Sequence, residues 1–311
     1  MRYSLAHHSI RGARKYNEDR VAVAERENAV LMVAADGLGG YAGGEIASEA
    51  MVETAVESFN KVRQPIIRDP SAFLVLTVMH AHRVVNKRAR EAGIEVSLPR
   101  TTCVICLVQN GYAYWGHVGD SRLYHFRGNQ LLTRTLDDST SERMRRDGLI
   151  SDDDMRTPNW QGQLVRCVGG LKRPVITLGA ETPLERDDVL LLCTDGVWRA
   201  FSNAQLIRQL RQERLDQMLE ELLQSAEKRM RKDCDNASAM VLRWEDECTV
   251  RSPIYGERAA QIDQEQLWRD ARLRAQEKRW LRTGEEQPVR DEIDLAIEEL
   301  ESFINEIERQ L

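Results

Sequence analysis

Four aspartates of this chain lie at the ends of short apolar segments, and this pattern limits the folds that the chain can adopt. They are Asp36, Asp120, Asp195 and Asp235. Asp36 directly follows the apolar run 29–35, and Asp235 lies just before the run 237–241. A single Asp-Gly pair is ordinarily a turn. Four carboxylates beside four strand-sized runs instead indicate a shared site, because gathered carboxylates repel one another unless a cation lies between them.

The residues that follow these aspartates favour a metal site. Gly37, Gly196 and Asn236 follow three of the four, and a glycine lets the backbone turn tightly and expose its carbonyl oxygen. Carboxylates, carbonyls and water are the ligands of Mg²⁺ and Mn²⁺. The glycine-rich run 36–44 lacks the lysine of a phosphate-binding GxxxxGK[ST] loop and does not fit GxGxxG. We therefore interpret it as a metal-binding turn that leads into a helix.

Hydrophobic periodicity predicts a mixed chain in which hairpins and helices are not regularly alternated. We expect helices over 45–61 and 71–92 and two amphipathic helices within 203–232. Strands are expected over 2–10, 20–24, 28–35, 102–109, 112–118, 122–127, 189–193 and 237–243. Asn110-Gly111 between two strands is a strong hairpin signal. The fold class expected is α+β, with antiparallel sheets and helices packed outside them.

Composition excludes several classes of protein. The net charge of −6 and a pI of about 5.7 argue against a general nucleic-acid binder. The longest apolar runs are strand-sized, far below the ~20 residues of a membrane span, and the first ten residues lack the apolar core of a signal peptide. We expect a cytoplasmic protein whose six cysteines are free thiols. Cys103 and Cys106 form a CxxC, but on a strand they face opposite sides, which argues against zinc or redox chemistry.

A charged cluster near the amino end adds an arginine to the acidic pattern. The segment 14–19 reads RKYNED. The guanidinium of Arg14 offers a planar fork that can hold a phosphoryl group by two bonds. Glu18 and Asp19 follow at four and five residues and can orient metal-bound water. In isolation such a cluster is ordinarily a solvated charged loop.

Taken together, these segments resemble the metal-dependent protein phosphatase family, type 2C, in its bacterial form. The matching segments follow the family's order: RKYNED (14–19), ADGLGG (35–40), RTTCV (100–104), GHVGDSRLY (116–124), LTRTLDDS (132–139), CTDGVW (193–198) and DCDNAS (233–238). They span about residues 1–245, some four fifths of the chain. No single segment is specific, but the ordered set is.

The resemblance implies a central antiparallel β-sandwich flanked by helices, with a binuclear Mn²⁺ or Mg²⁺ centre at one edge. It implies these roles: Asp36 bridging both metals, Gly37 giving a backbone carbonyl, Asp195 and Asp235 completing the first site, Glu18 and Asp19 holding metal-bound waters, Asp120 binding a third, weaker metal shared with Asp195, and Arg14 binding the phosphate. The implied reaction is hydrolysis of phosphoserine and phosphothreonine on proteins by a metal-bound hydroxide, with no protein nucleophile. The implied partners are phosphoprotein substrates and a bacterial Ser/Thr kinase pathway that the enzyme opposes.

The sequence departs from the family at one position beside the first DG motif. Many eukaryotic members have a histidine there as a candidate general acid, whereas this chain has Leu38, which cannot donate a proton. Bacterial members often have methionine at that position, so the change does not argue for inactivity. We interpret the nearby His117 as a packed histidine rather than an acid. The polar stretch 137–170, with Asp138-Ser139 and Arg166 in its recognisable ends, matches the family's flap subdomain.

The boundary of the resemblance divides the chain into two parts. Residues 1–248 are the expected catalytic domain, and 249–311 are an acidic, helical extension with 15 acidic and 10 basic residues. Its last part has apolar residues at heptad spacing: Ile293, Ile297, Leu300, Ile304, Ile307 and Leu311. Two interpretations stay open: a helix packed on its own domain, or a helix that binds a partner or dimerises.

Two other function classes fit the sequence less well than the phosphatase. A two-metal nuclease or other phosphoester hydrolase usually has histidine ligands, and none of the six histidines lies in the acidic motifs. A non-catalytic, phosphatase-like module acting through its C-terminal helices is the alternative. The presence of all the metal carboxylates and of Arg14 argues against it.

Overall fold

Two antiparallel sheets form the centre of the computed structural model, which describes residues 1–38, 43–157, 164–211 and 214–247. The first sheet has the order β1 (Tyr3–Ile10), β13 (Ala237–Trp244), β12 (Val189–Cys193), β7 (Arg122–Arg127) and β8 (Gln130–Arg134). The second has the order β10 (Thr177–Leu178), β6 (Tyr112–Val118), β5 (Cys103–Gln109), β3 (Ala29–Asp36) and β2 (Asp19–Arg26), with β11 (Thr182–Pro183) also paired to β6. The short strands β4 (Arg100–Thr101) and β9 (Val168–Gly169) pair separately.

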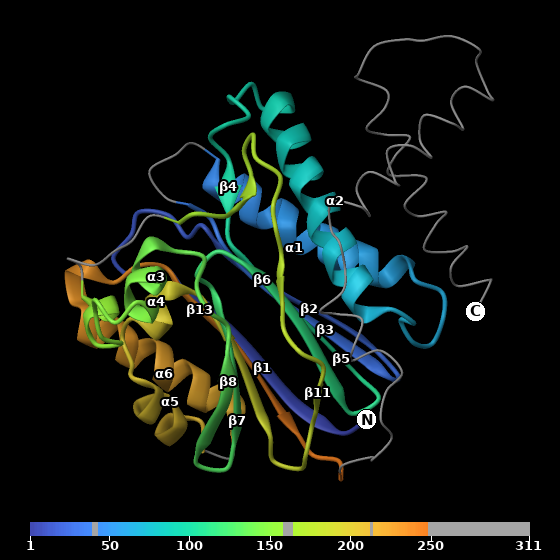
Figure 1. Ribbon diagram of the computed structural model, residues 1–311, viewed down its shortest axis with the longest axis vertical. Helices are drawn as coiled ribbons and strands as arrows, with labels where there is room; N and C mark the ends of the chain where they lie inside the picture. Colours follow the sequence, from blue (N-terminus) through green and yellow to red (C-terminus); the bar gives the residue numbers. More distant parts are fainter. Residues whose placement is uncertain (39–42, 158–163, 212–213, 248–311) are drawn as a thin grey trace.

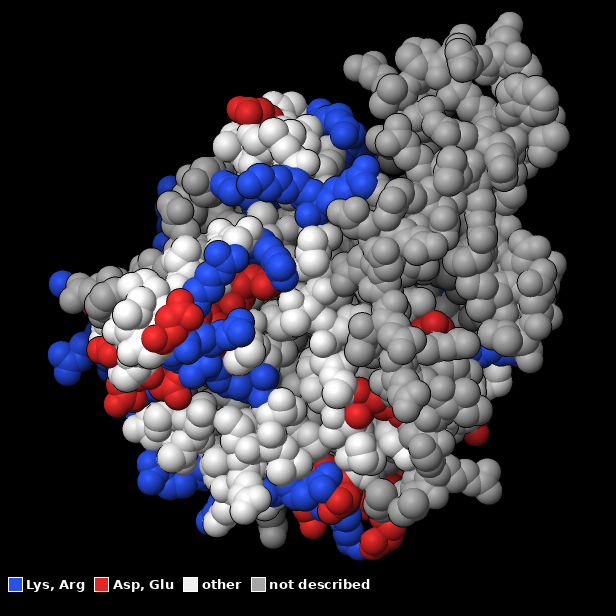
Figure 2. Space-filling view, viewed as in Figure 1, with Lys and Arg blue, Asp and Glu red and all other residues white. Residues whose placement is uncertain are grey.

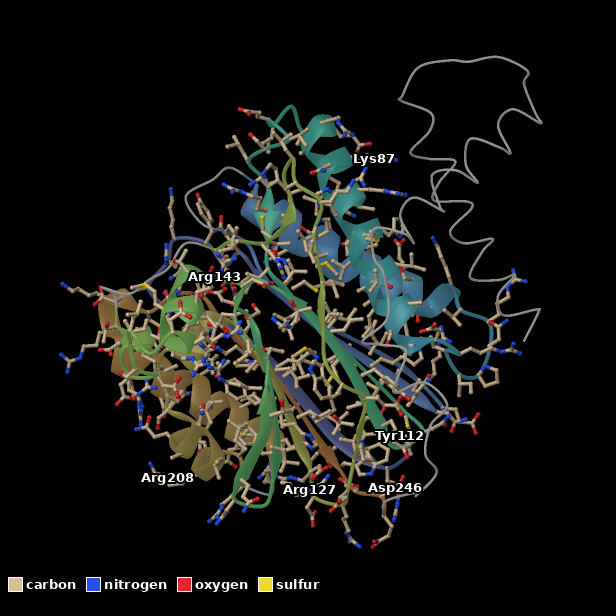
Figure 3. All side chains as sticks on the ribbon, in the orientation of Figure 1. Lys87, Tyr112, Arg127, Arg143, Arg208 and Asp246 are labelled. Carbon is tan, nitrogen blue, oxygen red and sulfur yellow. The ribbon has the colours of Figure 1, made fainter. Side chains whose placement is uncertain are left out.

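Helices cover both outer faces of the sandwich (Figure 1). The second sheet packs against α1 (Gly44–Lys61) and α2 (Pro70–Glu91), and the first sheet packs against α4 (Asp195–Trp198), α5 (Asn203–Gln209) and α6 (Leu215–Met230). The segment that matches the flap contains α3 (Thr140–Arg146) and the 3₁₀ turn η1 (Asp154–Arg156), and a second 3₁₀ turn, η3 (Arg231–Asp233), follows α6. Lys87 of α2 and Arg208 of α5 are exposed on the two opposite outer layers (Figure 3).

Strand alternation explains why the molecule has four layers. Along β3, Leu31 and Val33 belong to the apolar core beneath α1 and α2, whereas Met32 and Ala34 belong to the core between the two sheets. All four side chains are fully buried. A strand buried on both faces has a continuous apolar sequence, and this accounts for the uninterrupted run 29–35. The layered core therefore follows directly from the pattern.

The observed fold confirms the predicted α+β class and the αββα sandwich. The predicted helix over 45–61 is α1, and the one over 71–92 begins one residue earlier, at Pro70, where the Asp69 side chain accepts a hydrogen bond from the Ala72 backbone N–H at 3.0 Å. Cys103 and Cys106 point into different cores, as expected for positions i and i+3 of a strand. The five cysteines in the described residues are free thiols.

One sequence expectation falls on a part of the chain that the structure does not describe. The heptad segment of the extension lies outside the described residues, so its two interpretations stay predictions. None of the helices in the described part of the chain is both long and apolar enough to cross a membrane.

Candidate metal and phosphate site

Two carboxylates face each other at the edge where β2 begins and β3 ends. Asp19 is the first residue of β2, Asp36 is the last residue of β3, and the two are direct partners in the antiparallel ladder. The backbone of Asp36 is fixed from the neighbouring segment: its N–H donates to Thr102 Oγ1 at 3.0 Å, and its carbonyl accepts from Thr101 Oγ1 at 2.9 Å. The end of the apolar run is thus locked in place.

Asp19 joins this edge to the other sheet. Its Oδ2 accepts hydrogen bonds from Thr194 Oγ1 and from Ser238 Oγ, each at 2.8 Å. Thr194 lies between β12 and α4, and Ser238 is the second residue of β13. Asp19 is only 2% exposed. Asp19, which the resemblance implies to act through water, is therefore buried and connects the two sheets by hydrogen bonds.

Asp195 and Asp235 approach the same edge from the first sheet. Asp195 begins α4 directly after β12 and Thr194, and Asp235 lies just before β13. Asp195 Oδ2 pairs with Arg199 Nη2 at 2.9 Å, and Asp235 Oδ2 pairs with Arg14 Nη2 at 2.6 Å. The sequence placed Asp195 at a strand exit; the structure adds that it is the first residue of a short helix.

Asn236 fastens the loop that contains Arg14 and Glu18. Its Oδ1 accepts from the Glu18 backbone N–H at 2.8 Å, and its amide donates to the carbonyl of Tyr16 at 2.9 Å. The Arg14 side chain is 56% exposed beside Asp235. The amide after Asp235 was noted in the sequence, but its role in holding this loop could only be seen in the structure.

Gly37 is required by a close approach of three backbone segments. A Cβ at this position would lie 2.4 Å from the carbonyl oxygen of Gly44 and 2.8 Å from that of Glu18. The Gly37 N–H donates to the Glu18 carbonyl at 3.2 Å, and Gly37 forms an isolated bridge with Thr101. The glycine therefore lets the turn after Asp36 lie against the Glu18 loop.

Burial and mutual repulsion raise the pKa of the clustered carboxyls. Burial, followed by the neighbouring Asp195, raises the pKa of Asp19 to about 7, although its hydrogen bonds from Ser238 and Thr194 oppose the change. Burial raises the pKa of Asp36 well above its usual value, and the nearby Asp19 adds to this. Burial also raises the pKa of Asp120 to about 7. These groups resist carrying negative charge together, which is the electrostatic signature of a cation site.

The donor set fits a hard divalent cation. The carboxylates provide oxygen ligands, and Oδ1 of Asp19 and Oδ1 of Asp195 are buried and accept no hydrogen bond within the described residues. Oxygen-only donors suit Mg²⁺ and Mn²⁺. No three His, Cys, Asp or Glu side chains among the described residues already converge into a finished cation site. The carboxylates now face arginine or hydroxyl partners, so some of them would have to rotate to complete the ligand shell of a bound cation.

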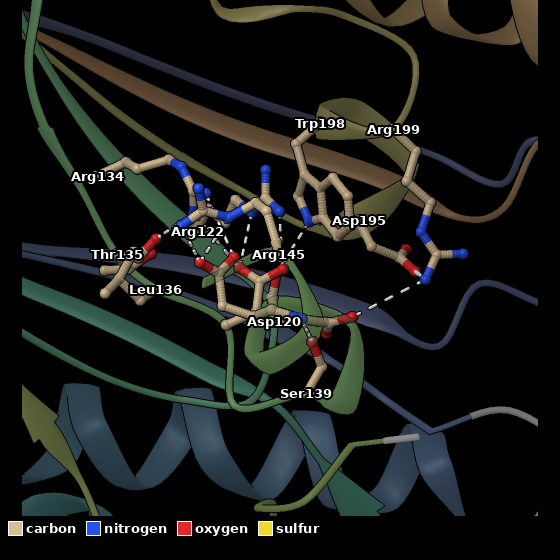
Figure 4. Close-up of polar contacts among 12 residues, drawn as sticks. Asp120, Arg122, Arg134, Thr135, Leu136, Ser139, Arg145, Asp195, Trp198 and Arg199 are labelled. Atoms are coloured by element: carbon tan, nitrogen blue, oxygen red, sulfur yellow. Dashed lines mark hydrogen bonds and ion pairs between the residues drawn. The ribbon is translucent and has the colours of Figure 1, made fainter. Parts of the chain in front are cut away.

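A buried network of arginines lies behind Asp120 (Figure 4). Arg122 donates from Nε and Nη2 to Asp137 at 2.8 and 2.7 Å, and its guanidinium stacks 3.6 Å from the ring centre of Trp198. Trp198 in turn donates its indole N–H to the Asp120 carbonyl at 2.8 Å. Asp137 lies at the start of the segment that matches the flap. This network was missed in the sequence, where Arg122 was only part of a motif.

The network continues into α3, on the side of the molecule where acidic and basic side chains lie next to one another in the space-filling view (Figure 2). Arg134 Nη2 lies 3.3 Å from Glu142 Oε2, and Arg145 Nε lies 3.4 Å from Asp152 Oδ1. Arg166, at the other end of the segment, pairs with Asp138 at 3.2 Å. This pair joins the two ends of the segment 137–170, and Asp138 connects the first end to the turn that contains Asp120, because its Oδ2 accepts from the Gly119 backbone N–H at 3.2 Å.

His117 is a packed residue, as the sequence predicted. It is 3% exposed, and its Nε2 lies 2.6 Å from the carbonyl oxygen of Leu136. A ring that is buried and engaged in this way cannot reach a substrate at the surface.

The sequence of this chain matches a known protein family over most of its length. The model of the Protein phosphatase 2C family matches residues 6–237. The chain belongs to the protein phosphatase 2C family. The match covers every candidate site residue, and it ends seven residues before the end of β13.

Individual serine/threonine phosphatases are similar to this chain in sequence and in fold. The serine/threonine phosphatase stp of Listeria monocytogenes is 27% identical over 186 residues, which cover 59% of this chain and 73% of the relative. The structure of Stp1 from Staphylococcus aureus superposes with a TM-score of 0.72 at 24% identity, covering 79% of this chain and 96% of that one. The catalytic domain of PstP, solved in complex with two manganese ions, has a TM-score of 0.66 at 24% identity, covering 78% and 99%.

Proposed function

We propose that Asp36, Gly37, Asp195 and Asp235 hold two divalent cations, Mn²⁺ or Mg²⁺, and that Glu18 and Asp19 support this site through water. The observation that carries the proposal is the meeting of β2, β3, β12 and β13 at one edge, where a buried Asp19 lies opposite Asp36 and is hydrogen-bonded to Thr194 and Ser238. Acidic groups brought together at this cost in solvation favour a cation as their partner.

As a member of its family, the chain is a metal-dependent protein serine/threonine phosphatase. Divalent cations bound at such a site lower the pKa of water enough for attack on phosphorus near neutral pH, and they offset charge on the phosphoryl oxygens. No serine, cysteine or histidine of the chain needs to act as nucleophile.

Arg14 is proposed to bind the phosphoryl group of the substrate. Its side chain is more than half exposed, and Asn236 holds its loop beside the carboxylates. A guanidinium can form two parallel bonds to phosphoryl oxygens and orient the phosphorus for in-line attack. Its pairing with Asp235 keeps it at the metal edge when no substrate is bound.

The leaving alkoxide has to be protonated by a group other than residue 38 or His117. Leu38 has no proton to give, and His117 is buried against the Leu136 carbonyl. We propose that solvent at the site supplies this proton. The segment 137–170, tied to Asp120 by the arginine network, forms one side of the site and is proposed to select among phosphoproteins produced by a Ser/Thr kinase.

The experiment that tests this function compares substrates and metals. The full chain is expected to release phosphate from phosphoserine and phosphothreonine peptides with added Mn²⁺ and to stop when EDTA is added. A phosphodiester such as bis-p-nitrophenyl phosphate serves as the control for a nuclease-like enzyme. Hydrolysis of the diester in preference to the phosphopeptides, or phosphatase activity that survives EDTA, would contradict the proposal.

A further inference from the structure

Arg199 directs its guanidinium at two carboxylates that come from different parts of the fold (Figure 4). Its Nη2 lies 2.9 Å from Asp195 Oδ2 and 3.9 Å from Asp120 Oδ2. Asp195 begins α4, whereas Asp120 lies in the turn between β6 and β7. The three side chains are only 17%, 10% and 11% exposed, in the order Arg199, Asp195 and Asp120. The positive charge is therefore enclosed with its partners.

Local structure holds this arginine and its distant partner in place. Arg199 follows α4 directly, and its backbone N–H donates to the Asp195 carbonyl at 3.0 Å, which puts both side chains on one face of a helical turn. Trp198 fixes Asp120 from the other side by donating its indole N–H to the Asp120 carbonyl at 2.8 Å. The Arg199 guanidinium also lies 5.3 Å from the centre of the same indole ring.

The family resemblance gives Asp120 and Asp195 to a third, weaker metal, and the geometry of this chain does not fit that assignment. A Mg²⁺ ion shared by two carboxylates needs an oxygen of each at about 2.0–2.1 Å, and Mn²⁺ takes the same kind of oxygen ligands. In this chain the Arg199 guanidinium interacts with both of these carboxylates. Arginine stays charged at all working pH values, so it also repels an incoming divalent ion.

We infer that Arg199 is a built-in cation that replaces a third metal at Asp120 and Asp195, so that the enzyme binds two divalent cations rather than three. The inference rests on the proposed metal site. Asp195 can take part in both interactions, because Oδ2 faces Arg199 while Oδ1 is buried and has no hydrogen-bond partner among the described residues. Asp120 is then a positioning residue for Arg199 and not a metal ligand.

A different role for Arg199 is binding of the substrate phosphate, and the two roles predict different measurements. The Arg199 Nε is buried and donates no hydrogen bond within the described part of the chain, so this N–H could serve a phosphoryl oxygen. A substrate-binding arginine would change KM when it is replaced and would leave the number of bound metal ions unchanged. A built-in cation changes the number of bound metal ions even when no substrate is present.

The test counts Mn²⁺ bound to the full chain by equilibrium dialysis, with free Mn²⁺ followed by electron paramagnetic resonance. We expect the unaltered chain and Arg199→Lys, which keeps the charge, to saturate at two ions per chain. Arg199→Gln should gain a third, weaker site. Asp120→Asn should leave the count of bound Mn²⁺ at two. This variant keeps the test usable if circular dichroism shows that Arg199→Gln folds poorly.

Three ions on the unaltered chain, two on a folded Arg199→Gln, or fewer than two on Asp120→Asn would each overturn the inference. The first and second results leave the proposed two-metal function intact. A chain that binds no Mn²⁺ at all overturns both proposals together, so the two failures can be told apart.

Discussion

Asp19 and Asp36 are direct cross-strand partners at the end of the β2–β3 ladder, and both belong to the cluster of carboxyls where the metal site is proposed. Like charges opposite each other on two strands destabilise a sheet. The pair is tolerated because Thr194 and Ser238, from the opposite sheet, donate to Asp19. The two sheets are therefore joined at the place where acidic side chains gather, so a cation bound at the proposed site would also stabilise the sandwich.

The first prediction concerns the hydroxyl that supports Asp19. Thr194→Val removes the donor to Asp19 and the acceptor of the Ser238 backbone N–H, which lies 3.0 Å away. We expect a loss of about 1–3 kcal/mol in the free energy of unfolding, because buried polar groups lose partners, and about 10–100-fold weaker Mn²⁺ binding, as for other residues that orient ligands. Urea unfolding and Mn²⁺ titration measure these effects.

The matched control is Thr182→Val, whose hydroxyl donates only to the nearby Ala180 carbonyl at a partly exposed position. It should change the unfolding free energy by no more than about 0.5 kcal/mol. Equal Mn²⁺ affinity in Thr194→Val and Thr182→Val would show that Asp19 has no part in the metal site.

The second prediction concerns pH and the metal-free protein. The folded-state pKa values of Asp19 and Asp120 are raised to about 7, whereas an unfolded aspartate titrates near 3.9. Between these values the folded chain holds more protons than the unfolded chain, so stability falls as the pH rises through this window. With EDTA present, the Tm should drop by at least about 3 °C from pH 5 to pH 8, the effect of roughly 1 kcal/mol in a domain of this size.

Bound Mn²⁺ should remove most of that decline, since a cation stabilises the ionised carboxylates. Asp19→Asn supplies the control, because it cannot ionise and should reduce the pH dependence in EDTA. A metal-free Tm that rises with pH over this range would contradict the account.

The third prediction concerns the C-terminal extension. All candidate site residues and the three apolar cores of the described part of the chain lie within residues 1–247. A chain ending at Glu247 should therefore fold and hydrolyse p-nitrophenyl phosphate with a kcat within about 2-fold of the full chain, since changes away from the site and the core have small effects. Circular dichroism and steady-state kinetics check this; loss of folding would place part of the core in the extension.

Light scattering on the same two proteins decides between the two interpretations of the heptad segment. A dimer helix predicts that the particle mass of the full chain is twice that of a single chain and that truncation returns it to one chain. A helix packed on its own domain predicts one chain per particle in both proteins.

The sequence predicted the layers of the fold well, because their causes are local. The alternating burial of Leu31 and Met32 follows from the strand period of two, and the Asn110-Gly111 turn joins β5 to β6 as its composition predicts. The sequence also brought Asp36, Asp195 and Asp235 together, although only through the order of the family's motifs.

The supporting contacts could not be predicted, because they depend on how distant segments pack. Thr194 and Ser238 are 175 and 219 residues from Asp19 in the chain, and Arg199 reaches an aspartate 79 positions earlier. Threonine, serine and arginine are common at surfaces, so their types indicate no role. The one available signal for Arg199 was its spacing of four residues from Asp195, which places both on one face of a helical turn.

The most direct test of the central claim is the Mn²⁺-dependent release of phosphate from a phosphothreonine peptide by the full chain and by Asp36→Asn. We expect the variant to keep its fold by circular dichroism, to bind Mn²⁺ more weakly and to lose at least about 100-fold in kcat/KM, since even residues that only orient metal ligands change activity by 10–100-fold. A folded Asp36→Asn with unchanged Mn²⁺ affinity and turnover would contradict it.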